Sequence, residues 1–278
     1  GRSGYDVITC LEGRSDFTRE KAVRCNIRDA GSLAAMVADA NLILSIVDPG
    51  KAVMVATKIA NVIKGANNKP AFADCNATAP ATAAEMNAIL EGAGAKFIDV
   101  GIIGGASTEK SSPMFCTSGP HGALMDEMDG RGVKILNVGS NIGQGSAIKI
   151  CNGAWNKGAF ALYTAVMMAA EHYGFIGHLS PRLPKAQAGT VDRIHQAITR
   201  LPALSGRYIG EMEQIAQTFE SIDLPAGFHE ASAELFRLLN STPLANERRE
   251  EIDADRTPED VLKIIIETLK RKKPAAAE

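Results

Sequence analysis

The feature that most constrains the fold of this chain is the alternation, through its first half, of short β-branched runs with alanine-rich stretches. Such alternation is typical of a parallel sheet that is covered by helices on both faces. The predicted strands cover residues 6–11, 42–47, 71–74, 96–100, 114–118 and 134–138. The predicted helices cover residues 32–38, 51–63 and 80–90. The first half is therefore predicted to be a doubly wound α/β domain.

The pattern changes after Gly145, where the strand signals end and residues 146–173 form one nearly unbroken helical stretch. A helix of this length exceeds most helices of globular domains and usually connects two domains. Only helical periods follow it. We therefore expect an α/β domain over residues 1–141 and an all-helical domain over residues 142–278.

The last predicted helix has a well-defined start. Thr257 is a candidate N-cap, Pro258 suits the first turn, and Asp260 completes a capping box. The apolar residues that follow recur at helical spacing, and they are Val261, Leu262, Ile265, Ile266 and Leu269. The sequence thus predicts an amphipathic helix near the end of the chain.

Charge and composition argue against several classes of function. The formal net charge of -2 gives no general attraction for nucleic acid, and one tryptophan and four tyrosines provide no stacking platform for single strands. No apolar run approaches the roughly 20 residues that a membrane span requires. The five cysteines lack CxxC spacing, and the five histidines lack metal-ligand spacing. We expect a cytoplasmic protein without a metal, a nucleic-acid partner or a membrane partner.

The end of the first predicted strand carries information about a nucleotide. An acidic residue at the end of the second strand of a nucleotide-binding sheet binds the ribose 2′-hydroxyl of NAD, whereas an arginine nearby binds the 2′-phosphate of NADP. Gly13 stands where the acid is expected, Arg14 can pair with a phosphate dianion, and Ser15 can donate a further hydrogen bond. These residues favour NADP. Glu12, one residue earlier, keeps NAD possible, and a turn with a solvated arginine is the structural alternative.

This interpretation makes residues 6–11 the second strand of such a sheet. The first strand and its phosphate-binding GxGxxG turn are then expected before Gly1, because no later group of glycines replaces them. We expect the natural polypeptide to extend about 25 to 30 residues before Gly1, the length of one complete βα unit.

Five motifs occur in an order that resembles one enzyme superfamily. They are SIVDPG at 45–50, ADCNATAP at 73–80, FIDVGIIGG at 97–105, CTSG at 116–119 and GQGSAIKICNGAWNKG at 143–158. Their order and spacing resemble the 6-phosphogluconate dehydrogenase and β-hydroxyacid dehydrogenase superfamily, and the closest likeness is to a poorly characterised phosphogluconate-dehydrogenase-like branch. The resemblance implies a Rossmann-like sheet domain, an all-α second domain, and hydride transfer between a pyridine nucleotide and a hydroxyacid.

The resemblance assigns the proton transfer to Lys149. Family members oxidise the substrate alcohol while a lysine on the interdomain helix accepts the hydroxyl proton, and Lys149 matches that lysine. The structural alternative is a lysine that extends from the helix surface into solvent. In the family an asparagine usually follows the lysine by four positions. Gly153 occupies that place here, and Asn152 comes one residue early, which makes Asn152 the second candidate catalytic residue.

Two further segments resemble parts of the family's cofactor site. The loop at 45–50 assigns Val47 and Pro49 to the nucleotide, and Asp48 stands between them where a proline is expected. Asn76 matches the polar position that family members place beside the nicotinamide ribose. An asparagine at a strand end also forms Asx turns, which is the structural alternative.

The substrate loop departs from the family. Its serine-glycine-glycine motif, which binds the substrate carboxylate, reads Ile103-Gly104-Gly105 here, so that only the backbone donors of Gly104 and Gly105 are retained. This departure favours a bulkier or partly apolar substrate.

Two cations of the helical half are further substrate candidates. Lys157, two turns after Lys149, could bind a carboxylate or phosphate or lower the pKa of Lys149, and a solvated lysine is the alternative. Arg207 is a secondary candidate for anion binding, and an ordinary surface ion pair with Glu211 is its alternative.

These observations lead to three hypotheses of function. The first is an NADP-dependent oxidoreductase acting on a small-molecule hydroxyacid or sugar-acid-like alcohol. The second is a ketone or imine reductase on the same scaffold, and the third is a catalytically silent NADP-binding dimer used as an interaction module. Lys149 favours an alcohol/ketone couple, and silent members of the superfamily typically lose this lysine. We expect a homodimer built from the helical half, which offers more apolar surface than one small core buries.

Overall fold

The computed structural model describes residues 4–108, 111–179 and 189–272. The chain divides into two compact units, Gly1–Ile150 and Cys151–Glu278. The division falls inside the long helix, whereas the predicted domain boundary at residue 141 lies just before that helix. The first residues of the helix belong to the first unit because side chains of the sheet bind them directly.

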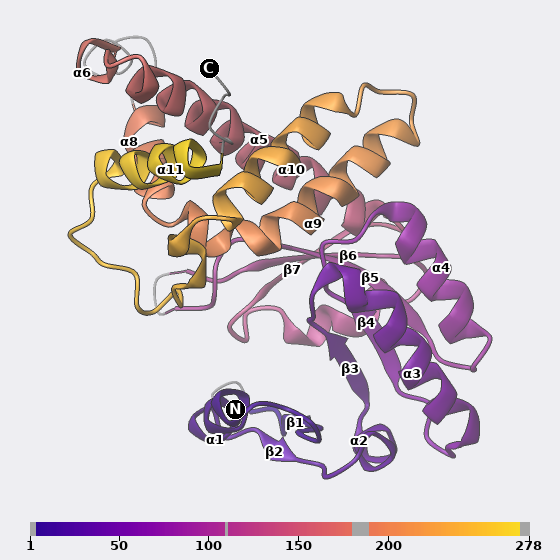
Figure 1. The fold of residues 1–278 in the computed structure, drawn as a ribbon. Helices are drawn as coiled ribbons and strands as arrows, with labels where there is room; N and C mark the ends of the chain where they lie inside the picture. The colour runs from indigo at the N-terminus through magenta and orange to yellow at the C-terminus, as the bar shows by residue number, and fades with distance from the viewer. Residues whose placement is uncertain (1–3, 109–110, 180–188, 273–278) are drawn as a thin grey trace. The chain divides into compact units, whose positions relative to one another are not determined.

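The main sheet of the first unit has five strands (Figure 1). They are β3 (Leu42–Ser45), β4 (Ala71–Asp74), β5 (Phe97–Ile103), β6 (Met114–Ser118) and β7 (Lys134–Gly139), hydrogen-bonded in that order. β3, β4 and β5 are parallel, β5 and β6 are antiparallel, and β6 and β7 are parallel. The predicted doubly wound parallel sheet is therefore confirmed except at β6, which is antiparallel to β5. Residues 104–113 form a link shorter than the dozen or so residues that a parallel crossover needs, so the chain turns back.

Two apolar clusters cover the faces of this sheet. Phe72 and Phe97 stack with their ring centroids 6.4 Å apart and pack with the buried residues of three helices. These helices are α2 (Leu33–Asp39), α3 (Ala52–Gly65) and α4 (Pro80–Glu91). Ala73, Ile98 and Phe115 belong to the second cluster, which includes Met125 of the 3-10 helix η2 (Gly122–Met128). Successive side chains of a strand point to opposite faces, so both faces are buried, as expected for a sheet of this kind.

A second, smaller sheet precedes the main one. It pairs β1 (Ile8–Thr9) with β2 (Arg28–Asp29) in parallel, and the two strands are joined through α1 (Asp16–Arg24). The strand predicted at 6–11 is therefore confirmed only at its centre. The sequence analysis missed α1 and β2 because α1 is strongly charged, with Ala22 its buried residue, and β2 is short.

The second unit consists of helices in its described part, as predicted. They are the remainder of α5 (Gln144–His172), then α6 (Ile176–Leu179), α8 (Thr190–Ile198), α9 (Leu201–Glu220), α10 (Gly227–Asn240), η3 (Pro243–Asn246) and α11 (Pro258–Lys272). Helix α5 has 29 residues, which confirms the long helix. Across residues 4–108, 111–179 and 189–272, no helix is both long enough and apolar enough to cross a membrane.

The capping box predicted for α11 is also confirmed. The amide of Asp260 donates to the Thr257 hydroxyl oxygen at 3.2 Å, and the amide of Thr257 donates to the Asp260 carboxylate at 3.1 Å. The Thr257 hydroxyl also donates to the Asp260 carboxylate at 2.6 Å, and this bond, together with the one from the Thr257 amide, lowers the pKa of Asp260. Val261, Leu262 and Ile265 of the predicted apolar stripe are buried.

Candidate active site

The start of α5 is attached to the sheet through a buried carboxylate. Asp99 of β5 is fully buried, and its Oδ2 atom accepts hydrogen bonds from the amides of Gly143 and Ser146, at 3.0 Å each. The Ser146 hydroxyl donates to Asp99 Oδ1 at 2.5 Å, and the Ser118 hydroxyl of β6 donates to Oδ2 at 2.8 Å. Ser118 accepts the amide hydrogen of Gly145 at 2.9 Å. Side chains of the sheet thereby bind helix amides that have no partner within the helix.

Two glycines allow α5 to lie directly against the strands. A Cβ atom on Gly145 would lie 2.5 Å from the carbonyl oxygen of Cys116 and 2.9 Å from that of Asp99. A Cβ atom on Gly101 would overlap the Gly145 carbonyl oxygen and lie 3.0 Å from the Cβ atom of Lys149. Any larger residue at either position would push the helix away from the sheet.

Lys149 follows this attachment by one turn and is half-buried. Its Nζ donates a hydrogen bond to the carbonyl oxygen of Ile102, near the carboxyl end of β5. Burial raises the pKa of the Cys116 thiol, and the positive charge of Lys149 opposes that rise. The lysine side chain therefore lies against the strands and does not extend into solvent.

Two of the predicted nucleotide residues meet at the carboxyl ends of β3 and β4. The buried Asn76 accepts a hydrogen bond from the amide of Val47 at its Oδ1 atom, at 2.6 Å. Its Nδ2 group donates to Ser45 Oγ at 3.2 Å and to Asp74 Oδ1 at 2.5 Å. The side chain of Asn76 thus holds the loop after β3 in place, and its oxygen binds that loop and not its own turn.

The same loop explains Asp48, for which the sequence offered no role. Asp48 caps the 3-10 helix η1 (Pro49–Lys51), because its Oδ1 atom accepts the amide hydrogen of Gly50 at 3.1 Å. Pro49 occupies the first position of this turn, where an amide hydrogen is not needed. Asp48 and Pro49 therefore shape the turn that leads into α3.

A second buried acid lies beside Asp99. Asp74 of β4 is its direct neighbour in the sheet and accepts hydrogen bonds from the side chains of Asn76 and Thr78. Burial raises the pKa of Asp74 to about 6, these hydrogen bonds oppose the rise, and the charge of Asp99 adds to it. The two carboxyl groups are thus held together in spite of burial and mutual repulsion.

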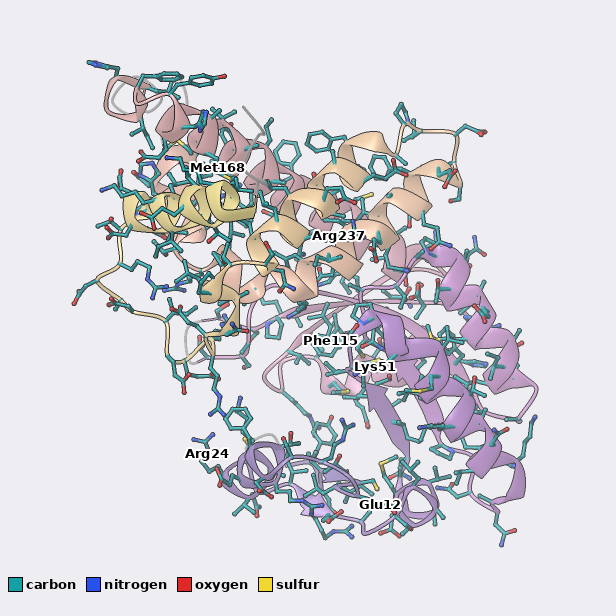
Figure 2. All side chains as sticks on the ribbon, viewed as in Figure 1. Glu12, Arg24, Lys51, Phe115, Met168 and Arg237 are labelled. Atoms are coloured by element: carbon teal, nitrogen blue, oxygen red, sulfur yellow. The ribbon has the colours of Figure 1, made fainter. Side chains whose placement is uncertain are left out.

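The residues predicted to bind the 2′-phosphate lie at the start of α1. Ser15 is the N-cap of this helix, and its Oγ atom accepts the amide hydrogen of Thr18 at 3.4 Å. Arg14 is exposed in the turn after β1. Glu12 is exposed in the same turn and is labelled in Figure 2. The capping role of Ser15 was not anticipated, and both charged side chains of the turn lie on the surface.

The predicted carboxylate-binding loop begins beside the Lys149 contact. Gly104 and Gly105 directly follow β5, and both are exposed. Gly104 has a φ of 102°, which favours glycine. Ile102, whose carbonyl oxygen binds Lys149, is two residues before Gly104.

The predicted cations of the second unit surround a buried acid. Lys157 Nζ lies 2.6 Å from Glu211 Oε2, and Arg207 Nε lies 2.8 Å from Glu211 Oε1. The Glu211 side chain is 3% exposed, Lys157 is 14% exposed and Arg207 is 66% exposed. Lys157 Nζ also lies 5.2 Å from the ring centroid of Tyr208. Lys157 is therefore not a solvated lysine, whereas the expected ion pair of Arg207 with Glu211 is present, with its carboxylate buried.

Asn152 and Gly153 lie on different sides of α5. Asn152 is exposed, and its carbonyl and side-chain oxygens accept hydrogen bonds from Asn156. A Cβ atom on Gly153 would lie 3.3 Å from Ile215 Cδ1 and 3.8 Å from Lys157 Nζ. The position of the family's asparagine is thus a place with little room for a side chain in this protein.

Sequence reasoning missed Asp99, Ser118 and Ser146 as members of the site. The available signal was an acid within a strand predicted to be buried on both faces, because such a carboxylate needs several donors. The serines carried no comparable signal, since their partners come from other elements. Among residues 4–108, 111–179 and 189–272, no three histidine, cysteine or acidic side chains are placed to hold a metal ion.

Comparison with known protein families identifies most of the first unit. Residues 2–129 match the family described as the NAD binding domain of 6-phosphogluconate dehydrogenase. The resemblance inferred from the five motifs is thereby confirmed. Residues 170–239 match a domain of unknown function, DUF1932.

Three similar proteins add to this finding. An uncharacterized 28.5 kDa protein of Methanothermus fervidus, from the 7S RNA 5′ region, is 27% identical over 174 residues, which are 63% of this chain and 65% of that relative. Mycobacterium tuberculosis 3-hydroxyisobutyrate dehydrogenase with L-serine has a TM-score of 0.64 and 16% identity, over 90% of this chain and 88% of that one. Psf3 in complex with NADP+ and 2-OPP has a TM-score of 0.60 and 16% identity, over 91% and 89%. At such identities the solved structures establish the fold, a Rossmann-like domain followed by a helical region.

Proposed function

We propose that this protein is an oxidoreductase that transfers a hydride between NADP and the carbinol carbon of a hydroxyacid or sugar-acid-like substrate. The observation that carries the proposal is the place of Lys149. Its side chain contacts the carboxyl end of β5, within the unit whose residues 2–129 match an NAD-binding family. In such sheets ligands bind outside the carboxyl ends of the parallel strands.

The loops at these strand ends fit a nucleotide. Val47 follows β3, Asn76 follows β4, and Gly104 follows β5, so that three candidate residues lie at the same edge of the parallel strands. Asn76 fixes the backbone at Val47, which leaves this loop preorganised for a ligand. We propose that Val47 and Pro49 contact the nucleotide and that Asn76 acts by holding their loop.

Lys149 would act as the acid/base group. Bound NADP+ would supply the acceptor for the hydride that leaves the carbinol carbon. The neutral amine of Lys149 takes the proton of the substrate hydroxyl, and in the reverse direction the ammonium group returns it to the carbonyl oxygen. The exposed backbone amides of Gly104 and Gly105 are the proposed donors to the substrate carboxylate.

The preference for NADP rests on Arg14. This exposed arginine lies next to the N-cap of α1, where a helix start adds its own attraction for a phosphate. The similar structure of Psf3 contains NADP+. Glu12 in the same turn is the residue that would bind NAD instead.

In the second unit we propose that Arg207, in preference to Lys157, is the substrate-binding cation. Glu211 engages both residues, but the Arg207 side chain is 66% exposed and that of Lys157 is 14% exposed. A guanidinium can retain one ion pair and present further N–H groups to a carboxylate or phosphate. Asn152, which is exposed, is a weaker candidate for the catalytic site.

The experiment is a screen for nucleotide oxidation and reduction. Wild-type protein would be offered NADP+ with a panel of hydroxyacids and sugar acids, and NADPH with the corresponding ketones and with imines, while absorbance of the reduced nucleotide is recorded. Turnover with an alcohol/ketone pair that Lys149→Met loses supports the proposal. Turnover of imines alone, or tight NADPH binding without any turnover, would establish one of the other two functions.

We also propose a homodimer that uses α5. Three large apolar side chains of this helix and one that directly follows it are exposed, and they recur at intervals of seven, four and seven residues: Trp155, Leu162, Val166 and then Tyr173. This spacing places them on one side of the helix, the arrangement that pairs long helices. Light scattering of the wild type should report twice the monomer mass, and Trp155→Glu should shift it towards the monomer. A monomeric wild type at micromolar concentration would contradict this proposal.

A further inference from the structure

The donors around Asp99 suggest a function beyond filling a buried space. The carboxylate accepts four hydrogen bonds, two from the amides of Gly143 and Ser146 and two from the hydroxyls of Ser118 and Ser146. Three of these donors belong to the start of α5. A carboxylate is favoured at a helix start because the free amides carry partial positive charge.

Lys149 is tied to the same strand by a second contact. Ser146 binds Asp99, and Lys149, three residues later on α5, binds Ile102, three residues after Asp99 on β5. Residues three apart lie on the same side of a helix. The helix start and the lysine are therefore held by two points on one strand.

The helix and the strand approach each other closely between these two points. A Cβ atom on Gly101 would overlap the Gly145 carbonyl oxygen, and neither glycine contributes a side chain to this contact. Hydrogen bonds have a narrow range of length and angle, so those of Asp99 set the position of α5 along β5. We propose that Asp99 is a positioning residue that places the Lys149 amine for proton transfer, with Ser118 and Ser146 as its supporting groups. This inference deepens the proposed function and rests on the role given there to Lys149.

Asp74 provides a matched comparison within the sheet. It is the register neighbour of Asp99 and is equally inaccessible, yet its side-chain partners are Asn76 and Thr78 and not α5. Asp99→Asn and Asp74→Asn remove the same charge from adjacent positions. If Asp99 acts on Lys149 and Asp74 acts on the Asn76 loop, the two variants should differ in which property they change.

The experiment measures amine reactivity and activity together. Trace acetylation with acetic anhydride, followed by mass spectrometry, gives the reactivity of Lys149 relative to the exposed Lys58 of α3, and its pH dependence. Asp99→Asn should change the Lys149 reactivity by about threefold or more and lower kcat by about tenfold, because small misplacements of a catalytic group are costly. Nucleotide affinity should stay within about twofold of the wild type, since the change is local. Asp74→Asn should weaken nucleotide binding and leave the Lys149 reactivity unchanged.

Hydrogen exchange supplies a structural readout. Amides of residues 143–146 should exchange faster in Asp99→Asn than in the wild type, while Asp74→Asn should leave them protected. Equal Lys149 reactivity and equal amide protection in wild type and Asp99→Asn would overturn the inference. The same result in both aspartate variants would also overturn it, because it would indicate a general loss of structure.

Milder variants keep the inference testable if Asp99→Asn does not fold. Ser146→Ala removes one hydroxyl donor to Asp99, and Ser118→Ala removes the acceptor of the Gly145 amide. Both should shift Lys149 reactivity in the same direction as Asp99→Asn, but less, and no shift in either would overturn the inference. The labelling result is independent of turnover. If Asp99→Asn alters the reactivity of the Lys149 amine but the wild type has no dehydrogenase activity, the proposed function is refuted. The positioning of Lys149 by Asp99 would then still stand.

Discussion

The two units each bury a carboxylate, but they satisfy it in different ways. In the first unit Asp99 binds backbone amides and hydroxyl groups, which are neutral donors. In the second unit Glu211 binds Lys157 and Arg207, which are cations. Both acids are almost inaccessible to solvent.

The difference separates a network that sets a position from one that balances charge. Neutral donors fix the carboxylate and the helix start without cancelling the negative charge, and the contact of Lys149 with β5 lies one turn away. Around Glu211 the negative charge is offset by the two cations. Removal of one buried charge from its partners is strongly unfavourable. We therefore expect changes near Asp99 to alter activity first and changes at Glu211 to alter stability first.

Lys149→Met should produce the largest effect. If Lys149 transfers the proton, kcat should fall by about 10²- to 10⁴-fold, and the variant should lack a limb of the wild-type pH–rate profile. Nucleotide affinity should be nearly unchanged. Lys58→Met, on the exposed face of α3, is the control and should retain full activity. A kcat close to that of the wild type, with the pH limb intact, would refute the catalytic assignment.

Glu211→Gln tests the charge-balancing network. It leaves the 14%-exposed Lys157 without its carboxylate, so the free energy of unfolding should fall by about 3 kcal/mol in urea titrations. Nucleotide affinity should not change. Glu213→Gln is the matched control on the same helix, because the exposed pair of Glu213 with Arg237 contributes less than about 1 kcal/mol. Equal losses in the two variants would show that the burial of Glu211 is not important.

Asp74 makes stability depend on pH in the first unit. Its pKa is raised to about 6 in the folded protein from 3.8. The contribution of Asp74 to the free energy of unfolding is therefore fully present below pH 3.8 and is lost as the pH rises through 6. A shift of this size corresponds to about 3 kcal/mol. Between pH 4 and pH 7, the free energy of unfolding of Asp74→Asn should therefore rise by about 2 to 3 kcal/mol relative to that of the wild type.

The measurement is the free energy of unfolding of both proteins at several pH values. Asp39→Asn is the control, because Asp39 is exposed on α2 and pairs with an exposed arginine. Curves for the wild type and Asp74→Asn that run parallel from pH 4 to pH 7 would exclude a raised pKa for Asp74.

Arg14→Ala should produce the smallest effect, because Arg14 is exposed and its loss leaves no buried group without a partner. The wild type should bind NADPH at least about tenfold more tightly than NADH, and the variant should lose most of this preference. Fluorescence titration measures both affinities. Arg24→Ala, at the opposite end of α1, is the control (Figure 2). Equal affinity of the wild type for the two nucleotides would disprove the NADP assignment.

Much of the architecture could be predicted from the sequence because it follows from local patterns. Short β-branched runs located the five strands of the main sheet, and α5 and α11 were found from helical spacing, from length and from the Thr257–Asp260 capping box. The short β2 and the charged α1 were missed, since neither shows an apolar period. The reversed direction of β6 was also missed, because direction depends on the length and path of the connection and not on the strand itself.

The sequence by itself determined the likeness to a nucleotide-binding family and the helical second half, and it made Lys149 the candidate acid/base group, because motifs in order along the chain carry this information. Only the tertiary structure decided what the polar residues bind. Asp99, Ser118 and Ser146 come from β5, β6 and α5, and Asn76 meets Val47 across two strand ends. Hydrogen bonds between residues far apart in sequence depend on strand register and helix position, which no local pattern specifies.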